Sequence, residues 1–192
     1  MLVASAEEIL AFWFAPEQEK RWYAKDAQFD AEIQSRFLAT YEAAVSGKLN
    51  AWRDDPRSML ALIVVLDQFP RNMFRGSPRT FAADAQAAGV CKEGIEKGFD
   101  RDIGNDELDF FHMPLMHSES PGDHDLFLRA HGDNESAREH REIIARFGRY
   151  PHRNETLGRE NTTEEDLYLR QSRPSFQVVS TRAVVGSKVA VR

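Results

Sequence analysis

A short polar phrase with the same chemistry occurs twice in this chain, each time after an apolar stretch. Residues 69–72 read Phe-Pro-Arg-Asn, and residues 150–154 read Tyr-Pro-His-Arg-Asn. Proline lacks the backbone N–H that continues a helix, so each phrase predicts a helix end, where free carbonyl groups need polar partners. A guanidinium can bind a carboxylate or phosphate through two parallel hydrogen bonds. Two such corners could therefore line one polar site.

The first corner combines an acid with two arginines. Asp67 precedes the proline near the expected helix end, where the helix dipole disfavours negative charge, so its carboxylate needs a cation. Arg71 and Arg75 are the nearest candidates. They could form a structural ion pair that fixes the turn. Alternatively, one guanidinium could stay free to bind an anionic ligand, with Asn72 fixing the orientation of that ligand.

The second corner gathers three arginines and a histidine within eleven residues. Two glycines and a proline punctuate this stretch, and apolar side chains lie between its charges, which favours a packed loop. A basic loop in solvent is the alternative. The residues that could bind a ligand here are Arg149, His152, Arg153, Asn154 and Arg159.

A third cluster follows Pro114, which is expected to interrupt its helix and free the backbone groups around it. His117 and Glu119 come directly after. A histidine with a carboxylate is equipped for proton transfer, and equally for a helix cap or an internal polar contact. His112 and His117 are five residues apart, so they do not share a helix face as paired metal ligands would. We expect neither a metal nor a cofactor.

The elements that must position these clusters are helical in nearly every segment before residue 170. Capping boxes begin at Ser5 and Thr162, where the hydroxyl and a glutamate three residues later satisfy each other's backbone groups. Asp26 or Asp30 could cap a long amphipathic helix, and Asp55 followed by proline is a further start signal.

Residues 59–66 are apolar around a whole helix circumference, which predicts a central helix buried on all sides, although a buried strand has a similar pattern. Glycines 98 and 148 are expected to end two of the later helices. Those further helices are predicted at about 80–97, 105–117, 121–131, 134–147 and 163–171.

These elements predict an all-α fold, with antiparallel helix pairs arranged as an α-α superhelix or an irregular bundle. No linker-like stretch interrupts the series, so we expect a single helical domain over residues 1–173. Residues 174–192 have strand composition but no other strand to join, which predicts an extended or disordered tail.

Composition limits the classes of partner. The 31 acidic and 25 basic residues give a net charge of −6, which argues against nucleic-acid binding. The single cysteine excludes an intrachain disulfide. Residues 1–8 lack the features of a signal peptide, and no apolar run approaches the roughly 20 residues that span a bilayer. We therefore expect a cytoplasmic protein without a nucleic-acid or membrane partner.

Ordered motifs recur along the chain, at residues 12–14, 66–72, 81–84, 113–119, 147–154 and 157–162. They resemble those of one bacterial family, catalogued as domain of unknown function nine-two-four. The resemblance covers roughly residues 7–170 and implies an all-helical fold similar to tetratricopeptide-like superhelices, although no clear repeat of roughly 34 residues is present. It implies no established activity.

Three functions are compatible with these patterns. Our leading hypothesis is a binding scaffold that holds an anionic small molecule or peptide in an arginine-rich polar pocket. The second is a metal-independent hydrolase or transferase that uses His117 and Glu119 for acid–base chemistry. The third is that the polar corners are purely structural locks at helix ends. The sequence predicts no oligomeric state.

Overall fold

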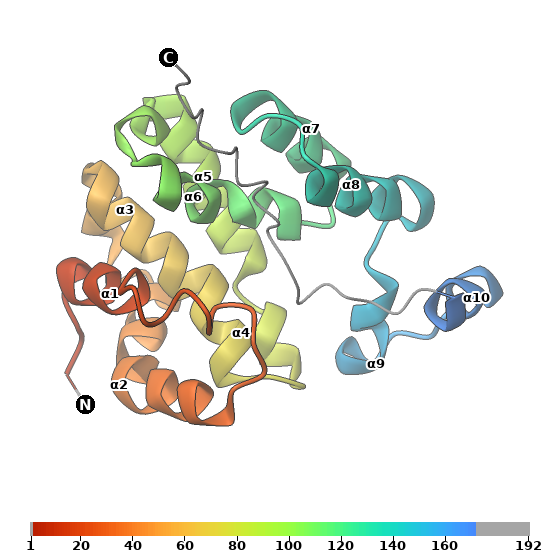
Figure 1. Cartoon of the computed structure of the whole chain (residues 1–192), viewed down its shortest axis with the longest axis horizontal. Coiled ribbons are helices and arrows are strands. Elements are labelled where there is room, and N and C mark those ends of the chain that lie inside the picture. The colour runs from red at the N-terminus through yellow and green to blue at the C-terminus, as the bar shows by residue number, and fades with distance from the viewer. Residues whose placement is uncertain (1, 172–192) are drawn as a thin grey trace, which may run out of the picture.

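The structure, a computed structural model, describes residues 2–171 apart from the side chain of Asp106. Helices joined by short turns make up this part of the chain, and no strand occurs in it, which confirms the all-α prediction (Figure 1). The tail expected at 174–192 lies outside the described residues. The superhelical arrangement and the domain boundary stay predictions.

The helices follow one another closely along the chain. Within residues 2–171, four 3-10 turns accompany them, at Asn50–Asp54, Pro78–Phe81, Phe99–Asp102 and Pro151–Arg153. The α-helices are α1 (Ala6–Trp13), α2 (Ala27–Val45), α3 (Pro56–Ile63), α4 (Phe69–Met73), α5 (Asp84–Lys97), α6 (Asn105–His117), α7 (Pro121–Ala130), α8 (Glu135–Phe147), α9 (Asn154–Leu157) and α10 (Thr163–Gln171).

Local capping chemistry sets most of these boundaries. The Ser5 capping box opens α1, and the Thr162 hydroxyl and Glu165 carboxylate exchange backbone contacts at the start of α10. Asp26 and Asp55 each accept two backbone N–H groups in the first turns of α2 and α3. These contacts confirm the predicted starts because the signals act within a few residues of each other.

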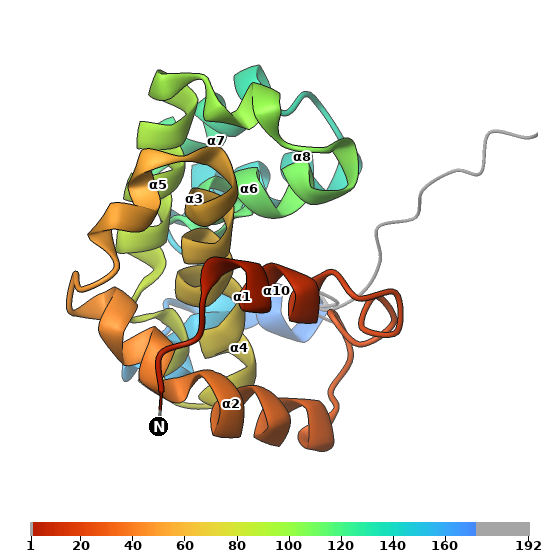
Figure 2. The same ribbon diagram turned by 90° about the vertical axis from the view of Figure 1, so that its left-hand side faces the viewer.

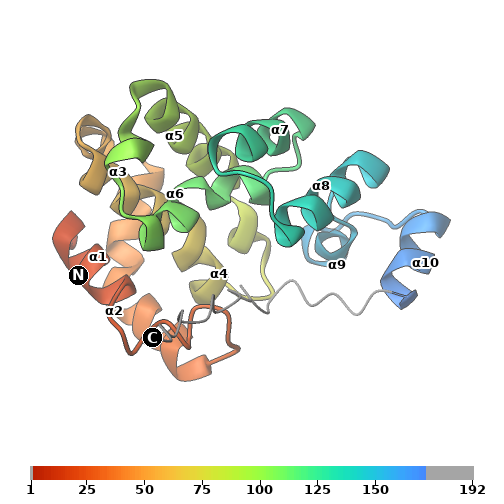
Figure 3. The same ribbon diagram turned by 45° about the horizontal axis from the view of Figure 1, so that its top comes forward.

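The helix that contains residues 59–66 is the centre of the core. Every residue from Met59 to Pro70 is buried. Helices α1, α5 and α6 pack against α3, and α2 packs against α4 (Figure 2). Helices α8, α9 and α10 lie on the side of the molecule away from α1 and α2 (Figure 3). The prediction of a helix buried on all sides is therefore confirmed.

The prediction that this helix ends at Pro70 was wrong. A π-helical turn, Val64–Gln68, follows α3 directly and leads into α4, so the helical path runs on to Met73. The N–H of Phe69 bonds the carbonyl of Val64, five residues earlier. Because the π turn restarts the helix here, Pro70 lies in a first turn, where its missing N–H leaves no helical hydrogen bond broken.

Pro114 does not interrupt its helix either. Helix α6 runs from Asn105 to His117 with the proline in its interior. The side chains of Phe110, Phe111 and Leu115 are buried on both sides of the proline. Burial of these apolar groups holds the helix together, since each large side chain contributes about 1.5–3 kcal/mol against the roughly 3 kcal/mol penalty of an interior proline.

None of the helices in residues 2–171 is long and apolar enough to cross a membrane. This finding agrees with the absence of an apolar run of that length in the sequence. The cytoplasmic location stays a prediction.

Gly94 permits close packing of α5 on α3 and α6. A Cβ at this position would lie 2.5 Å from a ring carbon of Phe111 and 2.6 Å from the sulfur of Met59. We expect Gly94→Ala to lower the free energy of unfolding by about 1–3 kcal/mol because the core must shift to admit the methyl group. Urea-induced unfolding measures this loss.

Gly89 on the same helix is the matched control, because a Cβ there meets no atom within 4 Å. Gly89→Ala should leave stability unchanged or raise it by up to about 1 kcal/mol through better helix propensity. Equal destabilisation by the two substitutions would contradict the packing described for Gly94.

Candidate functional site

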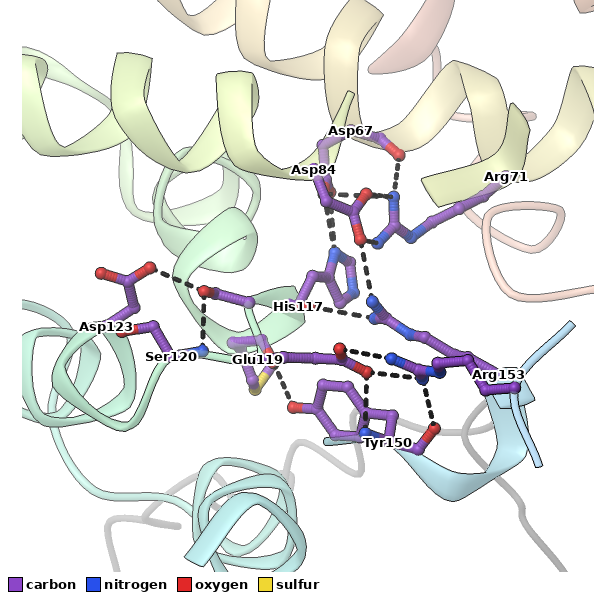
Figure 4. Close-up of polar contacts among 12 residues, drawn as sticks. Asp67, Arg71, Asp84, His117, Glu119, Ser120, Asp123, Tyr150 and Arg153 are labelled. Carbon is purple, nitrogen blue, oxygen red and sulfur yellow. Dashed lines mark hydrogen bonds and ion pairs between the residues drawn. The ribbon is translucent and has the colours of Figure 1, made fainter. Parts of the chain in front are cut away.

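Asp84, at the start of α5, joins the two arginine corners. Arg71 of α4 donates Nη1 and Nη2 to the two carboxylate oxygens at 2.9 and 3.1 Å. Arg153 of the turn Pro151–Arg153 donates Nη1 to Asp84 Oδ2 at 3.0 Å (Figure 4). The two corners, far apart in sequence, therefore meet at one carboxylate.

Asp84 was not among the predicted site residues. It stands in the motif at 81–84, and the available signal was an acid at the start of an expected helix. That position is also common for a simple helix-dipole contact. Arg71 and Arg153 both contact the side chain of Asp84 only because the fold brings the two corners together.

Arg153 is held on several sides and is 6% exposed. Its Nη2 donates to the carbonyl of His117 at 3.0 Å. Its guanidinium also lies 4.5 Å from the ring centroid of Phe81 and 4.6 Å from that of Tyr150. These ring contacts and the Asp84 ion pair compensate the removal of its charge from water.

Asp67 lies in the π turn and is completely buried. His117 Nδ1 is 2.8 and 3.0 Å from its two oxygens, and Gln68 donates Nε2 to it. Arg71 Nη1 is 3.3 Å from Asp67 Oδ1 and donates to the Asp67 carbonyl at 2.6 Å. Burial alone would raise the pKa of Asp67, but Arg71 and His117 outweigh burial and hold the pKa at about 2. The carboxylate is therefore ionised, and Arg71 is the cation that the sequence required.

His117 is the last residue of α6, and its ring is fixed by this carboxylate. An ionised carboxylate only accepts hydrogen bonds, so Nδ1 of the neutral ring carries the hydrogen. Nε2 has no hydrogen-bond partner among residues 2–171 and is not buried, and the side chain is 17% exposed. Burial and then the charge of Arg71 lower the pKa of His117. The neutral ring, with an open Nε2, is the form present at neutral pH.

Glu119, which the catalytic hypothesis combined with His117, makes its contacts elsewhere. It accepts Nη1 and Nη2 of Arg159 at 2.8 and 2.9 Å, and the backbone N–H of Tyr150 at 2.8 Å. Arg159 also donates to the Tyr150 carbonyl at 3.2 Å. Glu119 therefore joins the second corner to the end of α6. The carboxylate that contacts His117 is that of Asp67.

Three other predicted site residues bind carboxylates other than Asp67 and Asp84. Arg75 donates Nε and Nη2 to Asp30 at 2.8 and 2.9 Å, and Asn72 donates to the same carboxylate at 2.8 Å. Arg149 donates Nε and Nη2 to Glu165 at 2.7 and 2.8 Å. These contacts join α4 to α2 and the end of α8 to α10.

The remaining two predicted residues lie in the second corner. Asn154 donates Nδ2 to Asn161 at 2.8 Å. The His152 ring packs against the ring of Tyr150, with 5.4 Å between their centroids. Both contacts are with residues of the same C-terminal part of the chain.

Arg71 differs from the other four arginines of the two corners in the edge that it leaves open. Its two terminal nitrogens bind a carboxylate, whereas Nε–H and the adjacent Nη2–H have no partner in the described chain, and Nε is not buried. In Arg75 and Arg149 this same edge binds a carboxylate. In Arg153 and Arg159 the Nε atom is buried.

We expect Asp84→Asn to destabilise the protein by about 3–5 kcal/mol, because it leaves Arg71 and the buried Arg153 without their shared charge partner. Chemical denaturation measures the loss. Asp125→Asn is the control, since Asp125 pairs with Arg141 at the surface, where both side chains are about half exposed, and such pairs contribute about 1 kcal/mol or less. Similar small losses in both variants would contradict a central role for Asp84.

Comparison with known proteins agrees with the resemblance in the motifs. Residues 9–173 match a family described as bacterial protein of unknown function (DUF924). The protein of unknown function ATU0120 from Agrobacterium tumefaciens has a solved structure similar to this one, with a TM-score of 0.81 and 38% sequence identity over 87% of this chain and 97% of that chain. No curated protein matches. The chain is a helical protein that belongs to the bacterial DUF924 family of unknown function.

Proposed function

We propose that this protein binds a small carboxylic acid through the open edge of Arg71. The observation that carries the proposal is the pair of neighbouring donors, Nε–H and Nη2–H, which have no partner among residues 2–171. Such an edge matches the two oxygens of a carboxylate or phosphate. Asp84 binds the adjacent Nη1–Nη2 edge of the guanidinium and fixes its position, so little side-chain freedom remains to be lost when an anion binds.

The charges around this edge favour a singly charged ligand. Asp67 and Asp84 balance Arg71 and Arg153, while His117 is neutral at neutral pH. A dianionic phosphate would add two negative charges to a neutral cluster with low solvent exposure, and a carboxylate adds one. The Arg71 side chain is 20% exposed, which favours a small molecule over a peptide.

This proposal narrows the leading sequence hypothesis to one arginine. The other four arginines of the two corners bind internal carboxylates through geometry that leaves no accessible bidentate edge. Their contacts support the alternative hypothesis of structural locks for those residues. The binding role therefore rests on Arg71 and the groups that hold it.

Arg71→Lys should weaken carboxylate binding at least about tenfold, because lysine keeps the charge beside Asp67 and Asp84 but lacks the planar bidentate edge. The probes are acetate, propionate and benzoate, titrated into the protein and followed by NMR.

Arg75→Lys is the matched control, because Asp30 already occupies the corresponding edge of Arg75. It should leave the affinity unchanged. The proposal fails if none of the three acids binds, or if both lysine variants bind them equally well.

A further inference from the structure

We propose that His117 is a general base, oriented by Asp67 so that its Nε2 takes a proton from a water molecule or hydroxyl group beside the bound carboxylic acid. The placement of the substrate rests on the proposed binding at Arg71. The base itself is complete without any ligand, so the two proposals can fail separately.

The geometry of the pair supplies the orientation. Both oxygens of Asp67 lie within 3.0 Å of His117 Nδ1, and Gln68 donates to the same carboxylate. With Nδ1 carrying the hydrogen, the lone pair of the neutral ring is on Nε2, which has no partner among residues 2–171. A buried carboxylate that fixes the tautomer of a histidine in this way is the arrangement by which imidazole acts as a base in several enzyme classes.

Arg71 connects the base to the anion site, because one guanidinium contacts both halves. Its Nη1 lies 3.3 Å from the carboxylate that holds His117, and its open edge begins at Nη2 and Nε of the same planar group. Figure 4 shows Arg71, His117 and Arg153 converging on Asp67 and Asp84. An acid bound at that edge would therefore share one guanidinium with the carboxylate that orients His117.

The groups around His117 also couple proton uptake to anion binding. A proton on Nε2 gives the balanced cluster one positive charge, which Arg71 opposes. A carboxylate bound at Arg71 restores neutrality, so it should raise the pKa of His117. The charged and titratable groups that face the ring are Asp67 of the π turn, Arg71 of α4, Asp84 of α5, Arg153 and His152 of the 3-10 turn, and His140 of α8.

The step fits hydrolysis or acyl transfer of a substrate that carries a carboxylate and an ester. Nε2 accepts the proton of the attacking water or alcohol while its oxygen forms a bond to the carbonyl carbon. The bond to the leaving oxygen then breaks, and the proton on Nε2 passes to that oxygen. Water gives a carboxylic acid and an alcohol, and an alcohol nucleophile gives a new ester.

The first test uses ¹⁵N NMR of the histidine rings in buffer free of carboxylates. We expect the pKa of the His117 ring to lie below its ordinary value of 6.5. In its neutral form the ring should carry hydrogen on Nδ1 and none on Nε2. Asp67→Asn should lower this pKa further because the anion that stabilises the imidazolium is gone. Hydrogen on Nε2 of the neutral ring, or a ring still protonated at neutral pH, would overturn the proposal.

The second test asks whether the Nε2 lone pair, which the base requires, is accessible. It measures the reaction with 4-nitrophenyl acetate, an ester that an accessible neutral imidazole attacks as a nucleophile. His117→Gln should reduce the second-order rate constant at least about tenfold. His131→Gln is the control, because His131 is exposed to the same extent, 16% against 17%, but its ring contacts Asp109 and His112. Equal rates for His117→Gln and the unmodified protein would overturn the proposal.

Addition of acetate separates the two proposals. A rise in the pKa of His117 in the unmodified protein, absent in Arg71→Lys, supports both. If the two tests above give the expected results but acetate does not change the pKa of His117, the general base is supported and the anion site at Arg71 is contradicted. Acetate binding that depends on Arg71, without the predicted tautomer, contradicts the base alone.

Discussion

A carboxylate buried in the middle of the molecule dictates the arrangement of the polar residues around it. Asp67 has no contact with solvent and remains ionised, so neighbouring groups must supply the stabilisation that water would give. Arg71 and His117 do so. Arg71 in turn binds Asp84, Asp84 binds Arg153, and Arg153 holds the carbonyl of His117. The network closes on itself, which explains why it brings together elements that are distant in sequence.

The closed network also explains which atoms remain available for a ligand. Most polar residues that attracted attention in the sequence already have partners within the protein, and their contacts join α2 to α4, α8 to α10 and the second corner to α6. Two exceptions belong to residues that both contact the Asp67 carboxylate through other atoms. They are the Nε–Nη2 edge of Arg71 and the Nε2 atom of His117, and neither has a partner among the described residues. Two polar groups without partners in the described part of the chain, held in place by hydrogen-bonded neighbours, are the arrangement expected of a preorganised binding site.

Local signals predicted the helices well and their internal irregularities badly. The caps at Ser5, Asp26 and Asp55 act over three residues, so the sequence contains all the information needed. Proline is also a local signal, yet at Pro70 a π turn restarts the helix, and at Pro114 apolar packing on both sides outweighs the lost hydrogen bond. In both places tertiary structure overrides the local rule.

The site itself required the fold. The sequence identified His117, Asp67 and Arg71 as candidates, but it combined His117 with Glu119, which is near in sequence, for acid–base chemistry. The true partner is fifty residues away, and Asp84 was missed for the same reason. The residue types were informative because buried charges need opposite charges. Which charges pair depends on how α6 crosses the π turn, and no spacing in the chain encodes that crossing.

The most direct measurement is a crystal structure of the protein with 4-bromobenzoate, whose bromine is located by its anomalous scattering. We predict that the carboxylate oxygens of the ligand lie about 2.9 Å from Nε and Nη2 of Arg71, with the ligand beside Nε2 of His117. A structure in which a protein side chain occupies that edge of Arg71, or in which the ligand binds only elsewhere, would contradict it.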